Sequence, residues 1–233
     1  MNTSVFLDFV RFVIDGKIDR ITDCLSTHPK LAEIASPVGA TRADSRTFFF
    51  DSISHYMYAG DTALHMAAAA FRQPIAELLV NHGADTRARN RWGAEPLHYA
   101  ADTNRSDPKA QAEVIAYLIL MGADPDAVDN SGVAPLHRAV RTRSEDAVRA
   151  LLDGGADPRK PNKSGSTPLH LAVQTTGRGG AGSDEARRQQ AMIIRLLIKF
   201  GARSTDQDAN GKQVWQAATS EGIRSLLNEA RPS

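Results

Sequence analysis

The sequence predicts an all-α protein built from repeated helix–turn–helix units, and three observations support this prediction. A short motif ending in Leu-His recurs, with its histidine at His65, His98, His137 and His170. The intervals between these histidines are 33, 39 and 33 residues. A second motif, Gly-Ala-Asp, keeps step at residues 83–85, 122–124 and 155–157, and Gly-Ala follows at 201–202. Two motifs in register along most of the chain indicate a repeat protein.

The clearest copy of the first motif begins with a helix start signal. Thr167 can cap free backbone N–H groups, and Pro168 suits the first helical position. Leu169, Ala172 and Val173 then fall at helical spacing on one face. The glycine of the second motif supplies a left-handed residue after the return helix. Each unit is therefore predicted to hold two helices joined by a turn.

The composition limits the classes of partner. Lys and Arg number 28 against 27 Asp and Glu, so no overall field favours nucleic acid or a membrane surface. The single cysteine, Cys24, excludes an internal disulfide and a multi-thiolate metal site. Asp8 and Arg11 interrupt the apolar N-terminal run, which is therefore neither a signal peptide nor a membrane span. We expect a soluble, cytoplasmic protein.

The repeats divide the chain into a single domain over residues 1–233. The predicted parts are an N-terminal capping half-repeat (1–35), an aromatic insertion (36–57), four full repeats (58–89, 90–128, 129–161, 162–207) and a C-terminal cap (208–233). The second full repeat has six extra residues, placed around 102–108. The fourth has 13 extra residues, and its glycine-rich stretch 176–184 is predicted to be a flexible loop.

The aromatic insertion is the main departure from the repeat. It contains Phe48-Phe49-Phe50, and polar loops rarely carry such a run, so the segment is expected to pack against the body. One interpretation is a hydrophobic lid over the first helices. The other is a wall beside the binding surface, with a polar side made of Arg42, Asp44, Arg46, Asp51 and His55.

The 33-residue period, the Thr-Pro-Leu-His-x-Ala motif and the Gly-Ala-Asp motif together resemble ankyrin repeats. The resemblance implies antiparallel helix pairs stacked into a curved solenoid, with inter-repeat loops projecting as hairpins. It also implies a protein-binding module that presents a concave face, because few such proteins are catalytic through their repeats. The sequence departs from the pattern at Glu95 and Ala134, which replace Thr, at Arg138, which replaces an apolar residue, and at Phe71, which replaces a turn glycine.

The four motif histidines are interpreted as structural. In this family the imidazole bridges neighbouring loop backbones, and successive units lie roughly 10 Å apart. Zinc coordination needs nitrogens about 2 Å from one metal, so adjacent histidines would not share an ion. The sequence also lacks a nucleophile elbow, a phosphate-binding loop and a zinc-protease motif. We expect no enzymatic activity, no cofactor and no metal.

The candidate partner-binding residues occupy positions that the family projects into its groove. A cluster of Trp92 with Arg91 and, one unit further, Arg138 and Arg141 favours an acidic or aromatic partner surface, because Trp and Arg are frequent interface hot spots. At a net charge of +1 it is not interpreted as a nucleic-acid site. The full set is Tyr58, Asp61, Arg91, Trp92, Asp102, Asn130, Arg138, Arg141 and Lys163.

Three hypotheses for function follow. The leading one is a monomeric scaffold that binds a partner protein through its concave face and loop tips. The alternative is a small-ligand or enzymatic pocket where the insertion folds over the first repeats, with polar candidates Asp44, Arg46, Asp51, His55 and Tyr56. The third is self-association through an exposed phenylalanine run.

Overall fold

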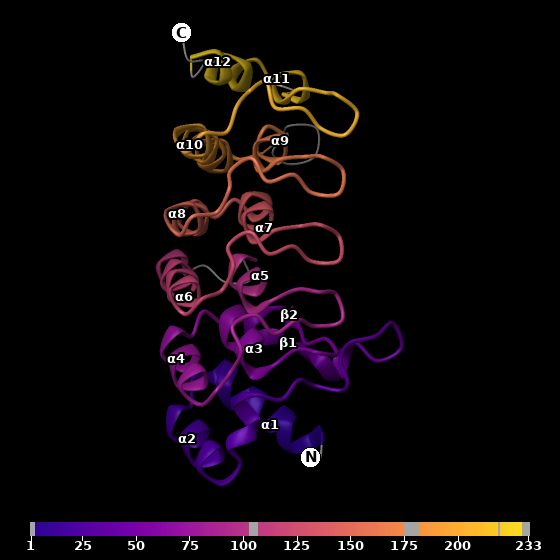
Figure 1. The fold of residues 1–233 in the computed structure, drawn as a ribbon, viewed down its shortest axis with the longest axis vertical. Helices are drawn as coiled ribbons and strands as arrows, with labels where there is room; N and C mark the ends of the chain where they lie inside the picture. The colour runs from indigo at the N-terminus through magenta and orange to yellow at the C-terminus, as the bar shows by residue number, and fades with distance from the viewer. Residues whose placement is uncertain (1–2, 103–106, 175–181, 219, 230–233) are drawn as a thin grey trace.

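The computed structural model describes residues 3–102, 107–174, 182–218 and 220–229. Figure 1 shows two columns of helices rising from the N-terminus, with loops projecting from one side. One column holds α1 (Thr3–Asp15), α3 (Ala63–Ala69), α5 (Pro96–Ala101), α7 (Pro135–Thr142), α9 (Pro168–Ala172) and α11 (Val214–Ala217). The other holds α2 (Ile18–Thr27), α4 (Gln73–Asn81), α6 (Pro108–Leu120), α8 (Glu145–Asp153), α10 (Asp184–Lys199) and α12 (Glu221–Glu229). This arrangement confirms the all-α solenoid.

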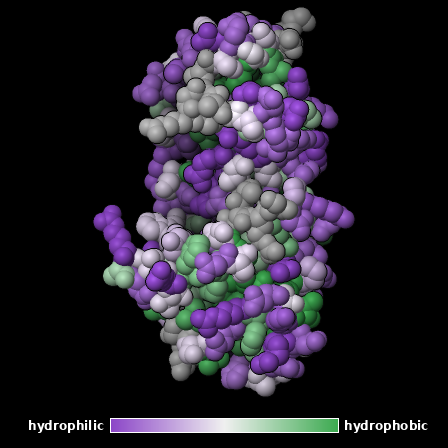
Figure 2. Space-filling view, turned by 180° about the vertical axis from the view of Figure 1, so that it is seen from behind, coloured by the Kyte–Doolittle hydropathy of each residue, from purple (hydrophilic) through white to green (hydrophobic). Residues whose placement is uncertain are grey.

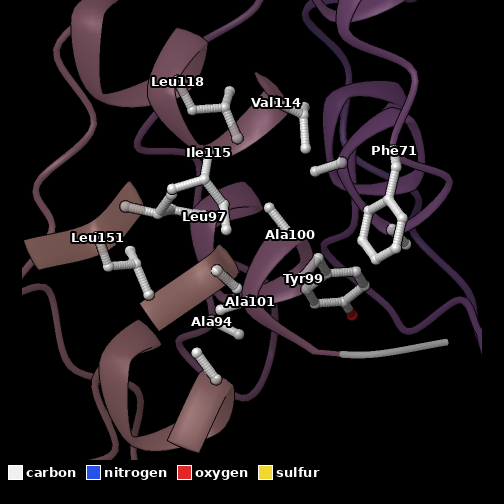
Figure 3. Packing of buried hydrophobic residues seen from close by; sticks show 14 of the residues in the cluster. Phe71, Ala94, Leu97, Tyr99, Ala100, Ala101, Val114, Ile115, Leu118 and Leu151 are labelled. Carbon is white, nitrogen blue, oxygen red and sulfur yellow. The ribbon is translucent and has the colours of Figure 1, made fainter. Parts of the chain in front are cut away.

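Small residues in the first column allow the units to stack closely. Ala67 and Ala68 of α3 are fully buried, as are Ala100 and Ala101 of α5. Figure 3 shows the layer around α5, where Leu97 lies among aliphatic side chains of α6 and α8 and the ring of Tyr99 points to the other side. One apolar cluster runs from α1 to α12 in the described residues, so burial is shared between neighbouring units.

The four motif histidines join each unit to the next. Nε2 of His65, His98, His137 and His170 lies 3.1–3.2 Å from the carbonyl oxygens of Ala94, Val133, Ser166 and Lys212, respectively. On the other side of each ring, Nδ1 accepts the backbone N–H of the residue three positions earlier, at 3.1–3.2 Å. Because Nδ1 accepts an N–H, the neutral ring carries its proton on Nε2 and donates it to the next unit. The structural interpretation of these histidines is confirmed.

The departures at Glu95 and Ala134 remove one hydrogen bond but keep the bridge. The Thr hydroxyl contacts the imidazole Nδ1 in the Thr62–His65 and Thr167–His170 pairs, at 3.0 and 2.9 Å. Neither Glu95 nor Ala134 has a hydroxyl, yet their backbone N–H groups still donate to Nδ1 of His98 and His137. The backbone contact alone therefore holds the ring in place.

The projecting loops are hairpins that also stack on one another. Their ends are closed by backbone hydrogen bonds in 90–94, 129–133, 162–166 and 208–212. The first residue of each, Asn90, Asp129, Asn162 or Asp208, accepts two backbone N–H groups of its own turn through Oδ1. Successive hairpins approach so closely that a Cβ added to Gly165 would lie 2.2 Å from the Ala209 nitrogen, at a φ of +72°. Glycine is therefore required at this contact.

The aromatic insertion packs back on the body, as expected. Phe48, Ile53 and Met57 are buried, and the segment holds η2 (Arg46–Phe48), η3 (Asp51–Ile53) and a two-stranded antiparallel sheet of β1 (Phe49–Phe50) and β2 (His55–Tyr56). The sequence did not predict this sheet, because the run of aromatic residues lacks the length and alternation of a strand pattern. The short helix η1 (Pro29–Ala32) precedes the insertion.

The two lengthened repeats share a capping device. Gln111 of α6 donates through Nε2 to the Ala100 carbonyl at 2.8 Å, and Gln190 of α10 donates to the Ala172 carbonyl at 2.6 Å. Both glutamines are buried and satisfy carbonyls at the end of the first helix of their unit. The extra residues predicted around 102–108, and the loop 176–184, fall largely outside the described residues.

Among the described turns between the two helices of a unit, two carry a left-handed residue other than glycine. Phe71 has a φ of +54° and Arg143 a φ of +59°, each between the two helices of a unit. For an L-residue this conformation costs about 1–2 kcal/mol. At Phe71 the buried ring offsets part of that cost.

Glu95 is a buried carboxyl group at a unit boundary, and replacing it should stabilise the protein. Its side chain is 6% exposed, and Oε2 has no hydrogen-bond partner in the described residues. Burial raises the pKa of Glu95 to about 7, against 4.5 when exposed. Ionisation is thus easier in the unfolded chain, and stability falls as pH rises from 4.5 through 7. We expect Glu95→Gln to stabilise the protein by about 3 kcal/mol at pH 8 in urea denaturation, and by much less at pH 4.5.

The matched control for this substitution is Glu113→Gln, which makes the same change at an exposed carboxylate beside Lys109. A gain that stays constant across the pH range, or one that Glu113→Gln reproduces, would contradict the role of burial.

The histidine bridges should make the fold sensitive to acid. Burial lowers the pKa of His98 to about 3, and burial also lowers the pKa values of His65 and His137. Below pH 6.5 the unfolded chain binds protons that the folded chain excludes, so the free energy of unfolding decreases as the pH is lowered. We expect the lowered pKa of His98 alone to reduce the free energy of unfolding by about 2 kcal/mol at pH 5 relative to pH 7.5. Denaturation should be measured in the Glu95→Gln background, which removes the opposing contribution.

In the same background, His98→Gln should flatten part of the acid slope. His82→Gln, at an exposed helix end, should leave the slope unchanged. Equal slopes for these two variants would show that the bridges do not control the acid response.

Candidate functional site

The hairpin face is the side of the solenoid formed by the hairpins 90–94, 129–133 and 162–166 together with α3, α5, α7 and α9. It corresponds to the groove in which the sequence places its binding residues. Figure 2 views the molecule from behind and shows a largely hydrophilic surface, with hydrophobic area gathered mainly in the N-terminal half. Large exposed apolar side chains in that half include Val38, Tyr56 and Trp92. The apolar part of this surface therefore lies toward its N-terminal end.

Asp61 lies beneath the hairpin face and not on it. Its side chain is fully buried, and Tyr99 Oη donates to its carboxylate at 2.8 Å. Asn90 Nδ2 donates to the same carboxylate at 2.8 Å, and the Tyr58 backbone N–H donates at 2.6 Å. The expectation that Asp61 contacts a partner is therefore wrong, because its carboxylate accepts hydrogen bonds that join repeat 58–89 to repeat 90–128. These two repeats are the second and third units of the solenoid when the N-terminal half-repeat is counted as the first. Burial raises the pKa of Tyr99 well above its usual value, so the phenol stays protonated.

Arg138 lies between two carboxylates. Its Nη1 is 2.7 Å from Asp102 Oδ2, and its Nη2 is 2.9 Å from Asp129 Oδ2. Burial alone would lower the pKa of Arg138, but the two carboxylates keep it above its usual value. The side chain is only 14% exposed, so it is mainly a clamp between units and not the exposed cation expected from the sequence.

Four aromatic rings follow one another from the insertion to the third unit. Phe49 and Tyr56 have centroids 4.7 Å apart, and Tyr56 and Tyr58 are separated by 6.2 Å. Tyr58 then meets Trp92 edge to face, also at 6.2 Å. Trp92 is 51% exposed and Tyr56 is 37% exposed, so this aromatic ladder presents two rings to solvent.

Arg91 packs on the ladder. Its guanidinium lies 5.2 Å from the Tyr58 ring centroid and 4.8 Å from that of Trp92, within cation–π range. Nη2 also donates to the Ala40 carbonyl at 2.6 Å, which ties the third unit to the insertion. Arg91 is therefore exposed but already engaged by this chain.

A pocket of about 340 Å³ lies between the insertion and units two to four. The insertion contributes Ser54, His55 and Tyr56, while the other lining residues are Tyr58, Asn90, Trp92, Ala94, Tyr99, Asp102, Asp129, Ser131 and Arg138. His55 stacks on Tyr99 with centroids 4.6 Å apart, and its Nδ1 is 2.7 Å from the Tyr56 carbonyl. Burial lowers the pKa of His55, which keeps the ring neutral.

The remaining predicted binding residues lie outside this pocket. Arg141 is 65% exposed at its edge, with Nη2 3.6 Å from Asp102 Oδ1. Asn130 and Lys163 are exposed on the next two hairpins, where Lys163 Nζ donates to the Asn130 carbonyl and Asn130 Nδ2 to the Arg91 carbonyl. Both line an open depression between those hairpins.

The polar residues of the alternative hypothesis separate into two groups. His55 and Tyr56 line the pocket, while Asp44, Arg46 and Asp51 are exposed on the insertion and do not contribute to its lining. The phenylalanine run is not exposed, because Phe48 is buried and Phe49 and Phe50 are partly buried. This burial removes the basis for self-association through that run.

The lining residues that sequence analysis did not single out include Tyr99, Asn90 and Asp129. Tyr99 holds the position after the motif histidine, as Arg138 does one unit later, and the other units have Met66 and Leu171 there. A comparison of this one position across the four repeats would have shown that two adjacent units replace an aliphatic residue with a polar one.

Helix pairs stacked in register, with histidine bridges and hairpin loops, define a repeat protein of the helix-pair class. A family model described as ankyrin repeats (3 copies) matches residues 46–108 and 106–181. The chain belongs to the ankyrin repeat family.

Curated relatives share part of the chain. It is 33% identical over 134 residues to human B-cell lymphoma 3 protein, covering 56% of this chain and 25% of that protein. It is 37% identical over 76 residues to mouse protein phosphatase 1 regulatory subunit 27, covering 33% and 46%. It is 32% identical over 113 residues to mouse ankyrin repeat and SOCS box protein 6, covering 46% and 25%. The matches thus span less than half the length of each relative.

Two kinds of feature are absent from the described residues. None of their helices combines the length and apolarity needed to cross a bilayer. None of their His, Cys, Asp and Glu side chains form a group of three suited to a metal ion.

Tyr99→Phe should destabilise the protein, because it removes a donor from the buried Asp61 carboxylate. The expected cost is about 2 kcal/mol in urea denaturation. Tyr117→Phe is the matched control, since the Tyr117 hydroxyl is buried with no partner in the described residues and its loss should cost nothing. Equal effects of the two substitutions would argue against a role for the Asp61 network.

Proposed function

We propose that this chain is a protein-binding scaffold that grips its partner through the hairpin face, centred on Trp92 and Arg141. Ankyrin repeats are generally protein–protein interaction modules, and the relatives include a phosphatase regulatory subunit. The observation that carries the proposal is the aromatic ladder, which leaves Trp92 half-exposed beside a pocket. A large aromatic ring fixed by its neighbours contributes contact area at little entropic cost.

The backbone around Trp92 is rigid enough to serve as an anchor. The Trp92 N–H donates to Asn90 Oδ1 at 2.9 Å, and the Trp92 carbonyl accepts the Asn130 N–H at 2.8 Å. The Tyr58 ring and the Arg91 guanidinium then hold the indole. Preorganisation of this kind lowers the cost of binding.

A small-ligand pocket is the second candidate, favoured by the 340 Å³ cavity between the insertion and the repeats. The polar groups inside it contact one another: Arg138 bridges Asp102 and Asp129, and His55 Nδ1 contacts its own backbone. This arrangement favours recognition over catalysis. We accordingly propose a non-enzymatic protein that is monomeric and cytoplasmic, which light scattering and cell fractionation would test.

Affinity capture from the native cell tests the hairpin face. The paired substitutions Trp92→Ala and Arg141→Glu should reduce recovery of specific partners by at least about tenfold, because hot-spot residues contribute 2 kcal/mol or more. Trp215→Ala is the matched control: this indole is 39% exposed but lies on α11, near the other end of the solenoid. Unchanged recovery by the double variant would show that the partner binds elsewhere.

A further inference from the structure

We propose that the pocket beside Trp92 receives a basic side chain, arginine or lysine, from a peptide segment of the partner. This inference rests on the proposed protein-binding function and names the chemistry of its central contact. It differs from the acidic partner expected from the sequence, because the structure engages Arg91 and Arg138 in contacts within this chain.

Three side chains that line the pocket keep unused hydrogen-bond acceptor capacity. Asp102 Oδ2 is hydrogen-bonded to Arg138. Within the part of the chain that the structure describes, its Oδ1 is paired with Arg141 Nη2 at 3.6 Å, beyond hydrogen-bonding distance. Asp129 Oδ2 receives one N–H from Arg138 and keeps further lone-pair capacity. His55 donates through Nδ1 to the Tyr56 carbonyl, so its Nε2 is an acceptor in the neutral ring.

On the donor side, the Arg138 Nε–H has no partner among the described residues. It lies beside two carboxylates, which oppose the approach of an anion to that group. The hydroxyl groups that line the pocket can accept as well as donate, so a ligand that supplies N–H donors finds partners among them and among the carboxylates.

The local charge also favours a cation. Asp102 and Asp129 line the pocket, and Asp61 lies directly beneath it, hydrogen-bonded to Tyr99 and Asn90, which are neutral donors. Burial lowers the pKa of His65, so the imidazole 4.0 Å from Asp61 adds no charge at neutral pH. The lining itself holds two carboxylates, Asp102 and Asp129, against the single guanidinium of Arg138. Just outside the lining, Asp61 lies beneath the pocket, Arg141 lies at its edge and Arg91 packs on the aromatic rings.

Aromatic side chains form another part of the lining. Tyr56, Tyr58 and Trp92 line the pocket, and two of them already hold the Arg91 guanidinium at 4.8–5.2 Å from their ring centroids. These rings are therefore placed where a cation is attracted to their electron-rich faces. A basic side chain could lay its apolar stem along the aromatic wall and direct its charged end to the carboxylates.

The test titrates the full-length protein with three end-blocked pentapeptides of the form Gly-Gly-X-Gly-Gly. The central residue X is arginine, citrulline or glutamate. Binding is followed by the indole N–H resonances in NMR spectra. Trp92 reports on the pocket and Trp215 is an internal reference, and the Trp92→Phe spectrum assigns the two signals. We expect the arginine peptide to shift only the Trp92 resonance, with saturation, and the neutral citrulline peptide to bind at least about tenfold more weakly.

Asp129→Asn tests the carboxylate without breaking its hairpin. Asn90 and Asn162 hold the same position in neighbouring hairpins and accept the same two backbone N–H groups, so the substitution keeps the turn. We expect Asp129→Asn to weaken arginine-peptide binding by about fivefold or more. The control is Asp208→Asn, which makes the same change in the last hairpin, outside the pocket, and should leave binding unchanged.

Equal binding of arginine and citrulline, preference for glutamate, no shift of Trp92 with any peptide, or equal effects of Asp129→Asn and Asp208→Asn would each overturn the basic-side-chain assignment. The scaffold proposal would still stand if the Trp92 and Arg141 variant lost its partners in affinity capture. The two ideas therefore fail in distinguishable ways.

Discussion

The histidine bridge is the interaction on which the rest of the structure depends. Each imidazole accepts a backbone N–H of its own unit and donates to a carbonyl of the next, so it fixes both the start of the first helix and the distance to the following hairpin. The bridge works only with a neutral ring, and burial lowers the pKa values of His65, His98 and His137 accordingly. Because every bridge has the same geometry, equivalent residues of successive units are brought into rows.

These rows explain how a pocket arises in a regular solenoid. The residue after each motif histidine is Met66, Tyr99, Arg138 and Leu171 in turn, so the two polar members are neighbours. Tyr99 reaches back to Asp61, and Arg138 reaches Asp102 and Asp129. These contacts bring polar groups of three successive units together. The insertion supplies His55 and Tyr56 against them.

The sequence predicted the fold well because the repeat motifs are local and redundant. Four copies of Leu-His and the Gly-Ala-Asp motif specify helix starts and turns without reference to tertiary contacts. The site was only partly predictable, because exposure depends on neighbours in the next unit. Asp61 and Trp92 both occupy variable hairpin positions, yet Asp61 is fully buried and Trp92 is half-exposed. Spacing gave the position of each residue in its repeat, but it did not show that Tyr99 would cover Asp61.

The local rules of the repeat are broken for different physical reasons. At Tyr99 and Arg138 the polar side chains find partners and together shape a cavity, which is the pattern expected where a fold accommodates a binding site. At Glu95 the carboxyl oxygen is buried without a partner in the described residues and the group lies outside the pocket lining, and nothing in the structure explains its presence. A departure from the repeat therefore points to function only when its polar atoms converge with those of other units, and in this chain that convergence occurs beside Trp92.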